Sequence, residues 1–244
     1  RSESLAHPSG PAARLCASLS KYSNFFIGHS EKAGDPSPYA AESTYVAIKA
    51  ASEVVFGSGS IENKKVIVKG VGKVGVALVD LLASDNAQIT ISDIDVEAII
   101  NIKKRHAELK IIKAEDCHTF GCDIFSPCAL GDEFNNKNIR LIRASMICGA
   151  ANNQLHDIRI GNMLHGRGIV YVPDFIANSG GLINVVDELY PGGYSLGRVR
   201  GHILNIRELV IKILLRSRQD NIPPAVIAEA MALDVIHHNH HQTR

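Results

Sequence analysis

The sequence lacks the features that mark secreted, zinc-stabilised or membrane-spanning proteins. Its cysteines number only five and show no C-x-x-C spacing, which argues against both a disulfide framework and a zinc site. No apolar run approaches the roughly 18 residues that a membrane span requires. We therefore expect reduced thiols, no metal site and no membrane segment.

The chain also has almost no net charge. Lys and Arg number 26 against 25 Asp and Glu, which gives a formal net charge of +1. Proteins that bind nucleic acid typically gather basic residues on one face, and here the basic residues are scattered along the chain. This balance favours small-molecule chemistry and predicts that neither nucleic acid nor a membrane is a partner.

The amino-terminal segment has no uninterrupted apolar core of the kind that a signal peptide needs. Residues 1–24 contain several Arg and Ser with one acidic residue, a composition that also suits an organellar transit peptide. Because the sequence does not begin with Met, a fragment is the simpler interpretation. The prediction is a cytoplasmic protein, with an organellar location as the alternative.

Apolar periodicity predicts short strands that alternate with helices. Such an order indicates a parallel sheet covered on both faces. The predicted fold class is therefore α/β, a doubly wound parallel sheet (Rossmann-like) with a C-terminal helical extension. The expected strands are 64–70, 87–93, 122–129, 144–152 and 168–175, and the expected helices are 38–57, 73–84, 94–106, 181–190, 199–219 and 224–238.

A G-x-G-x-x-G pattern joins the first expected strand to the helix that follows it. Gly70 would turn the chain off the strand, Gly72 would admit a pyrophosphate against bare backbone, and Gly75 would let the helix pack closely. The phosphates would then meet free N–H groups at the positive end of the helix. The candidate cofactor-binding residues of this loop are Gly70, Val71, Gly72, Lys73, Val74 and Gly75.

Two charged residues refine this interpretation. Asp93 closes the next strand, eighteen residues beyond Gly75, where a carboxylate accepts hydrogen bonds from the adenosine ribose. That carboxylate would repel a 2′-phosphate, so NAD is favoured over NADP. Asp93 could instead cap the following helix. Lys73 could lie near the pyrophosphate or be a solvated lysine of the first helical turn.

Four further stretches extend the match beyond the glycine loop. They are similar to the Glu/Leu/Phe/Val amino-acid dehydrogenase family, most closely to its leucine and phenylalanine dehydrogenase branch, and the last three match without gaps and in the family's order. The resemblance covers Phe26 to the C-terminus. The stretches are GDPSP (34–38), CDIFSPCALG (122–131), GAANNQL (149–155) and VPDFIANSGGLINVVDELY (172–190).

The resemblance implies NAD-dependent oxidative deamination of a branched-chain or aromatic L-amino acid to its 2-oxo acid and ammonia. It also implies a homo-oligomer if the protein is complete. Residues 38–190 would form the NAD-binding domain, after a residual segment 1–37 and before C-terminal helices 191–244. By position, the cofactor would further contact Ile94, Cys128, Ala129, Leu130, Ala150, Asn152 and Asn178.

Leu182 and Val185 match the positions that line the family's side-chain pocket. Each of these assignments has a plainer alternative. The stretch 178–181 could be only a helix start with permissive glycines, and Leu182 and Val185 could be core residues. Asn153 would cap the segment that follows it.

The family's catalytic machinery is not found in this sequence. The resemblance implies a Gly-Gly-Gly-Lys segment and a second lysine in a preceding substrate domain, and neither motif is present. Lys21, Lys32 and Lys49 lack the glycine context, so no catalytic residue is assigned. Ala40 also stands where the family usually has threonine. The alternative function is a noncatalytic NAD-binding remnant or a fragment without the catalytic lysines.

Overall fold

The structure, a computed structural model, describes residues 33–242, without the side chains of 236 and 238–242. Its centre is one six-stranded sheet in which every pairing is parallel. The strands are β1 (Lys65–Lys69), β2 (Gln88–Ser92), β3 (Lys110–Ile111), β4 (Cys122–Pro127), β5 (Ala144–Ile147) and β6 (Val170–Tyr171). Their order across the sheet is β3-β2-β1-β4-β5-β6. The first strand, β1, therefore lies in the interior of the sheet, and the later strands are added outward on both sides of it. The predicted doubly wound fold is confirmed.

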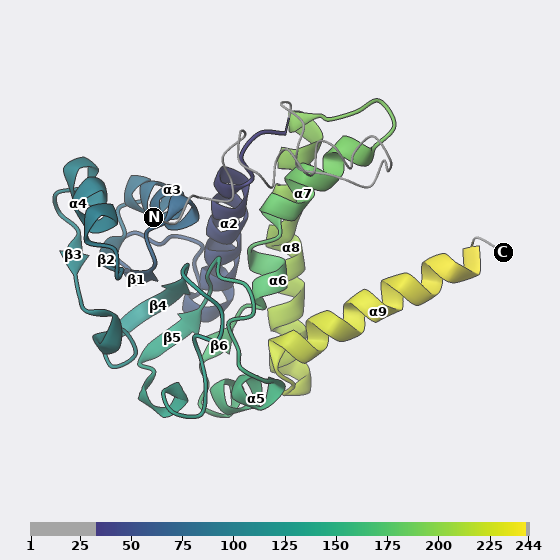
Figure 1. Cartoon of the computed structure of the whole chain (residues 1–244). Coiled ribbons are helices and arrows are strands. Elements are labelled where there is room, and N and C mark those ends of the chain that lie inside the picture. The colour runs from purple at the N-terminus through teal and green to yellow at the C-terminus, as the bar shows by residue number, and fades with distance from the viewer. Residues whose placement is uncertain (1–32, 243–244) are drawn as a thin grey trace.

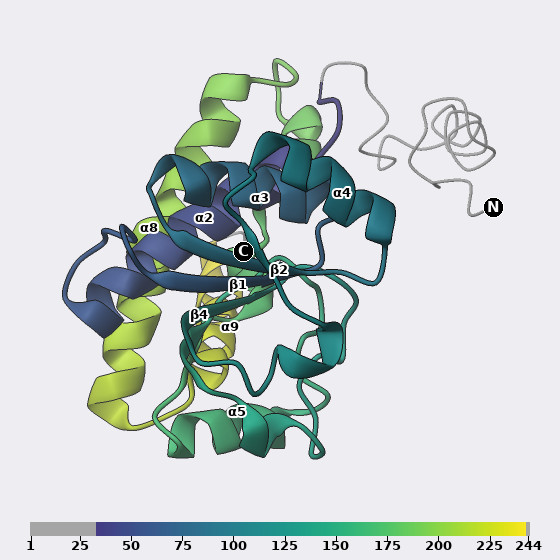
Figure 2. The ribbon, with the colours of Figure 1, turned by 90° about the vertical axis from the view of Figure 1, so that its left-hand side faces the viewer.

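Helices cover both faces of this sheet and extend past it. Seen from the side in Figure 2, α2, α3 and α4 lie on one face and α5 on the other, and α9 runs outward from the body in Figure 1. The helices are α2 (Ser37–Phe56), α3 (Lys73–Ser84), α4 (Val96–Arg105), α5 (Ile158–Gly166), α6 (Asp174–Ala177), α7 (Gly180–Val186), α8 (Leu196–Asp220) and α9 (Pro224–Gln242). Single 3₁₀ turns lie at η1 (Ala114–Asp116), η2 (Ile139–Leu141) and η3 (Asp187–Leu189).

Strand alternation divides the core into two layers. On β1, Val66 and Val68 face the layer beneath α2 and α3, whereas Ile67 faces the layer that contains Phe125 and Phe134. All five side chains are at most 1 % exposed. Because successive strand residues point to opposite faces, one short apolar strand contributes to both layers, as the sequence predicted.

Some elements differ from those that periodicity predicted. The two-residue strand β3 and the helix α5 were not predicted, because β3 is shorter than any periodic signal and α5 contains Gly161 within its nine residues. The expected strands at 144–152 and 168–175 were too long. Their ends form the loop after β5 and the start of α6, where backbone groups bond to neighbouring segments instead of to the sheet.

The cysteines and the helix lengths within residues 33–242 bear on two expectations from the sequence. The cysteines of this range, Cys117, Cys122, Cys128 and Cys148, are free thiols, as expected, and no helix there is long and apolar enough to cross a membrane. Cys16, Lys21 and Lys32 lie outside the described residues, as does the Arg- and Ser-containing segment considered as a transit peptide.

Candidate functional site

The glycine loop lies where β1 ends and α3 begins. Gly70 has a φ of 100°, and a Cβ there would meet the backbone N of Ala129 at 2.6 Å. A Cβ on Gly75 would meet the carbonyl oxygen of Gly70 at 2.0 Å. In contrast, a Cβ on Gly72 would meet no atom within 4 Å. Gly70 and Gly75 are therefore required by packing, whereas the space in front of Gly72 is open to a ligand.

The amino terminus of α3 carries no protein cap. Gly72 is the N-cap residue, and no side chain of the described part of the chain accepts a hydrogen bond from the first turn. The first N–H groups of a helix need acceptors and lie at its positive end. An open glycine next to uncapped N–H groups fits the pyrophosphate of a dinucleotide.

Asp93 connects the end of β2 to this loop. Its carboxylate accepts hydrogen bonds from the backbone N–H of Val71 at 2.6 Å and of Asp95 at 2.9 Å. The cap of α4 is Asp95, which accepts from Glu97 and Ala98, so the alternative that Asp93 caps this helix is wrong. Asp93 instead holds the glycine loop through the Val71 N–H.

Lys73 is a largely solvated lysine of the first helical turn, as the alternative had it, and it also has a charged partner. Its ammonium lies 3.2 Å from the Asp35 carboxylate in the segment before α2, and both side chains are about half exposed. The contact joins the Gly-Asp-Pro-Ser-Pro stretch to the glycine loop across an exposed gap. An exposed pair of this kind contributes little stability, typically about 0–1 kcal/mol, so it leaves Lys73 available to an incoming anion.

A cleft of about 560 Å³ opens beside the loop, between the start of α2, the loop after β5 and α7. Six of the residues that the sequence singled out line it: Val74, Ala150, Asn152, Asn178, Leu182 and Val185. Pro36, Ser37, Ala40, Phe175, Ser179 and Gly181 complete the wall. The volume lies in the usual range for small-molecule sites, about 300–1,000 Å³.

Two asparagines form the polar edge of the cleft. The Asn178 side-chain nitrogen donates to the Asn152 side-chain oxygen at 2.5 Å and to the Ala150 carbonyl at 3.2 Å. Gly149 allows the loop that carries Ala150 and Asn152 to lie close to the end of β4, because a Cβ at position 149 would meet the Pro127 carbonyl oxygen at 2.2 Å. Asn153 does not cap the helix that follows it, since Asp157 caps α5.

The apolar side of the cleft belongs to α7. Leu182 is 63 % exposed and Val185 is partly buried, so the alternative that both are core residues is wrong for Leu182. The helix is held close to α2 at Gly180, whose Cβ would meet the Tyr39 carbonyl oxygen at 2.0 Å. Gly180 is therefore more than a permissive helix start: it brings the apolar wall against the first turn of α2.

The remaining predicted cofactor residues lie along the same edge of the sheet but outside the cleft. Ile94 and Leu130 are 89 % and 84 % exposed after β2 and β4. Cys128 and Ala129 follow β4, where their backbone contacts Gly70. Burial raises the pKa of the Cys128 thiol, which keeps it protonated and makes it a packing residue.

Comparison with known proteins fits this geometry. The model of the Glutamate/Leucine/Phenylalanine/Valine dehydrogenase family matches residues 39–190. This chain belongs to that family. It is 40 % identical over 199 residues to the leucine dehydrogenase of Geobacillus stearothermophilus, which covers 82 % of this chain and 53 % of that enzyme. It is 33 % identical to the valine dehydrogenase of Streptomyces albus, with 82 % and 55 % covered.

A solved structure gives the same result. The L-tryptophan dehydrogenase of Nostoc punctiforme superposes with a TM-score of 0.85 at 30 % identity, covering 94 % of this chain and 65 % of that one. The chain spans about half the length of the curated Glu/Leu/Phe/Val dehydrogenases that it matches.

Ala40, which stands where the resemblance implies threonine, lines the cleft. Its carbonyl oxygen accepts from Ser43 and Thr44 at 3.0 and 2.8 Å. The first turn of α2 is thus held by side chains of the same helix, and no hydroxyl projects from position 40 into the cleft.

A charged cluster next to the glycine loop was not predicted from the sequence. The Glu133 carboxylate lies 2.6 Å from both the Lys69 ammonium and the His118 imidazole, with the Glu133 side chain 8 % exposed. Lys69 directly precedes Gly70, and Glu133 follows Leu130, so the cluster ties the two cofactor-edge loops together. No local motif predicts it, because its members come from three separate segments.

Proposed function

We propose that this chain binds NAD along the carboxyl edge of its sheet and belongs to a dehydrogenase that oxidatively deaminates a branched-chain or aromatic L-amino acid. One observation carries the proposal. Val74, in the first turn of α3, lines the same cleft as Leu182 and Asn178, so the phosphate cradle and the cleft are continuous. A dinucleotide lying over Gly72 would bring its nicotinamide end into that cleft.

The cleft residues divide into two roles. Asn152 and Asn178 offer amide donors and acceptors that would orient the nicotinamide carboxamide or the substrate. Leu182 and Val185 offer an aliphatic surface that favours apolar substrate side chains, because burial of each CH₂ contributes about 0.8 kcal/mol. When bound, NAD would accept the hydride from the amino-acid α-carbon, and water would then complete the conversion to 2-oxo acid and ammonia.

We further propose that NAD is preferred over NADP. Asp93 places a carboxylate at the end of β2, where it accepts from Val71 and would repel a 2′-phosphate. The test is titration of the protein with both dinucleotides. We expect the wild type to bind NAD more tightly than NADP. An Asp93→Ser variant should bind NAD more weakly and show a smaller ratio of NAD affinity to NADP affinity. Equal affinities in the wild type would refute the preference.

A matched control is available two residues further on. Asp95→Ala removes the cap of α4, which costs about 1 kcal/mol of stability. It should leave the NAD-to-NADP ratio unchanged, because Asp95 only caps the helix. A ratio that shifts equally in both variants would assign the effect to general loosening of the loop.

A second candidate function is a noncatalytic NAD-binding module. In residues 33–242 no lysine lines the cleft, and Lys49 is instead held by Asp85 at 2.6 Å outside it. A general base must reach the reacting proton directly or through one water. NADH formation with leucine, valine and phenylalanine, measured beside NAD titration, separates the two: turnover supports the enzyme, and binding without turnover supports the module.

Three broader features are proposed as well. The chain divides into 1–37, 38–190 and 191–244, and the complete protein is a homo-oligomer. Its location is cytoplasmic, with an organellar location as the alternative. Light scattering after size exclusion tests the assembly, for which a monomer would be the contrary result.

A further inference from the structure

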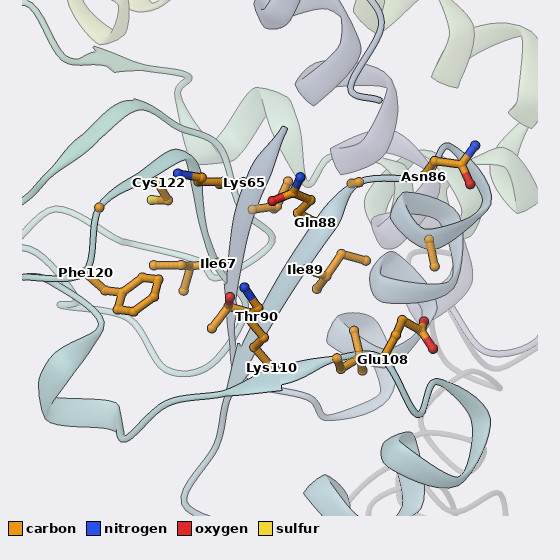
Figure 3. A pocket seen from close by; sticks show the side chains of 15 residues that line it. Lys65, Ile67, Asn86, Gln88, Ile89, Thr90, Glu108, Lys110, Phe120 and Cys122 are labelled. Atoms are coloured by element: carbon orange, nitrogen blue, oxygen red, sulfur yellow. The ribbon is translucent and has the colours of Figure 1, made fainter. Parts of the chain in front are cut away.

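A second cavity lies at the amino-terminal edge of the sheet (Figure 3). Its volume is about 670 Å³, again within the range of ligand sites. Lys65, Gln88 and Cys122, the first residues of β1, β2 and β4, line it. The glycine loop leaves the opposite end of β1, and the two cavities share no lining residue. This cavity is therefore separate from the proposed NAD and amino-acid site.

The cavity exists because a covering helix is missing. Parallel strands are usually joined by a helical crossover, yet residues 112–121, between β3 and β4, contain only the single turn η1. The right-handed crossover rule places this connection on the face opposite α3 and α4. Phe120, at its end, is 42 % exposed, and its ring points toward Ile67 of β1 in Figure 3.

Strand register arranges the floor of the cavity. Lys65 pairs with Gln88 on the neighbouring strand, and Ile67 pairs with Thr90, which in turn pairs with Lys110. Residues paired across a parallel sheet point to the same face, as do residues two apart on one strand. These five side chains therefore share one face, with apolar Ile67 and the Thr90 hydroxyl between two lysines.

The polar groups of this floor are without partners inside the described part of the protein. Neither Lys65 nor Lys110 has an ion pair there, and no side-chain hydrogen bond is formed by Thr90. The nearby carboxylates are engaged: Glu108 lies 3.4 Å from His106, and Asp123 accepts from the Lys65 backbone N–H at 2.8 Å. Two unpaired ammonium groups beside apolar surface suit an anion with an apolar body.

The thiol of Cys122 adds apolar surface and no reactivity. Burial, assisted by the charge of Asp123, raises its pKa to about 12. The thiolate is the nucleophilic form of cysteine, so this thiol stays protonated near neutral pH. Binding in the cavity is therefore noncovalent.

We propose that this cavity binds a monocarboxylate with an apolar chain. The ammonium groups of Lys65 and Lys110 attract the carboxylate, the Thr90 hydroxyl donates to it, and the chain packs against the Phe120 ring, which is 42 % exposed. The site is independent of the proposed dehydrogenase reaction, and both sites can be filled at once.

The test is calorimetric titration of the protein with octanoate, with 1-octanol as the uncharged analogue. We expect octanoate to bind and the alcohol to bind about tenfold more weakly. Lys65→Gln and Lys110→Gln should each lower the affinity for octanoate two- to fivefold, since partly exposed ion pairs contribute about 0.2–1 kcal/mol. The double variant should bind octanoate about tenfold more weakly than the wild type. Phe120→Ala should lower the affinity for octanoate and for 1-octanol by the same factor.

Two controls make the result specific. Lys113→Gln removes an exposed lysine close to the cavity but outside its lining, and it should leave affinity unchanged. Leu182→Asp places a charge in the amino-acid cleft and should likewise have no effect, as should saturating NAD. The proposal is overturned if octanoate does not bind, if the double lysine variant binds it normally, or if Leu182→Asp or NAD abolishes binding.

Discussion

Two alanine substitutions in one loop should separate packing from cofactor binding. A Cβ on Gly75 would lie 2.0 Å from the Gly70 carbonyl oxygen, whereas ordinary C···O contacts begin near about 3.3 Å. The first turn of α3 must therefore move by roughly 1 Å. Strain of this kind in a packed region costs about 1–3 kcal/mol, and we expect Gly75→Ala to lower the free energy of unfolding by that amount.

Gly72→Ala should instead weaken NAD binding and leave stability almost unchanged. A Cβ there meets nothing within 4 Å, and its φ of −70° is open to any residue. The free energy of unfolding should therefore change little, because the lower entropy of the unfolded chain with alanine is offset by the poorer fit of alanine than glycine at an N-cap. The same methyl would occupy the space in which we place the pyrophosphate. NAD affinity should fall by about tenfold or more, a loss of about 1.4 kcal/mol.

The assays are thermal unfolding followed by circular dichroism and NAD titration by calorimetry. For a chain of this size each kcal/mol shifts Tm by roughly 2–4 °C, so Gly75→Ala should melt several degrees earlier and Gly72→Ala should not. Normal NAD binding by Gly72→Ala would refute the phosphate cradle. An unchanged Tm for Gly75→Ala would refute the packing argument.

Two further predictions concern buried polar groups. Glu133→Gln leaves the Lys69 ammonium, 19 % exposed in its side chain, without its counter-charge and should cost about 3 kcal/mol. Burial by itself would raise the pKa of Glu133, but the hydrogen bonds from His118 and Lys69 outweigh it and hold that pKa below its usual 4.5. The stabilising contribution is therefore full above pH 4.5 and is lost as pH falls through the lowered pKa, which urea unfolding at several pH values measures. Tyr194→Phe removes the hydroxyl that donates to the fully buried Asn184 at 2.9 Å and should cost about 1–3 kcal/mol, measured by urea unfolding at neutral pH.

Each of these predictions has a matched control. Glu115→Gln changes an exposed carboxylate 3.9 Å from Lys113 and should alter neither stability nor its dependence on pH. Tyr39→Phe removes the hydroxyl that lies 3.1 Å from the Tyr194 hydroxyl. The Tyr194 hydroxyl still donates to Asn184 in this variant. Tyr39→Phe should therefore lower the free energy of unfolding by less than Tyr194→Phe does. A Glu133→Gln variant with the wild-type acid profile, or equal costs for the two tyrosines, would contradict the assignments.

The local elements were predictable where short stretches of sequence decide them. Gly57 ends α2 in the left-handed conformation at a φ of 77°, and the run of β1 and α3 around the glycine loop follows from periodicity and glycine spacing. The two-residue β3 was not predictable in this way, since it forms only by pairing with Thr90 and Ile91 of β2. Its existence depends on a neighbour that lies twenty residues away in the sequence.

From residue types at close spacing alone, the sequence predicted the α/β class, the β1–α3–β2–α4 run around the glycine loop, the three glycines of that loop and the family resemblance, but not β3, α5 or α6. Only the tertiary structure decided which side chains meet. The Asn152–Asn178 contact joins residues 26 apart, and the Glu133 cluster joins β1 to two loops. Strand register and helix packing set such contacts, and they also leave Leu182 on the cleft wall and Lys65 and Lys110 without an ion pair among residues 33–242. No pattern along the chain encodes these distances.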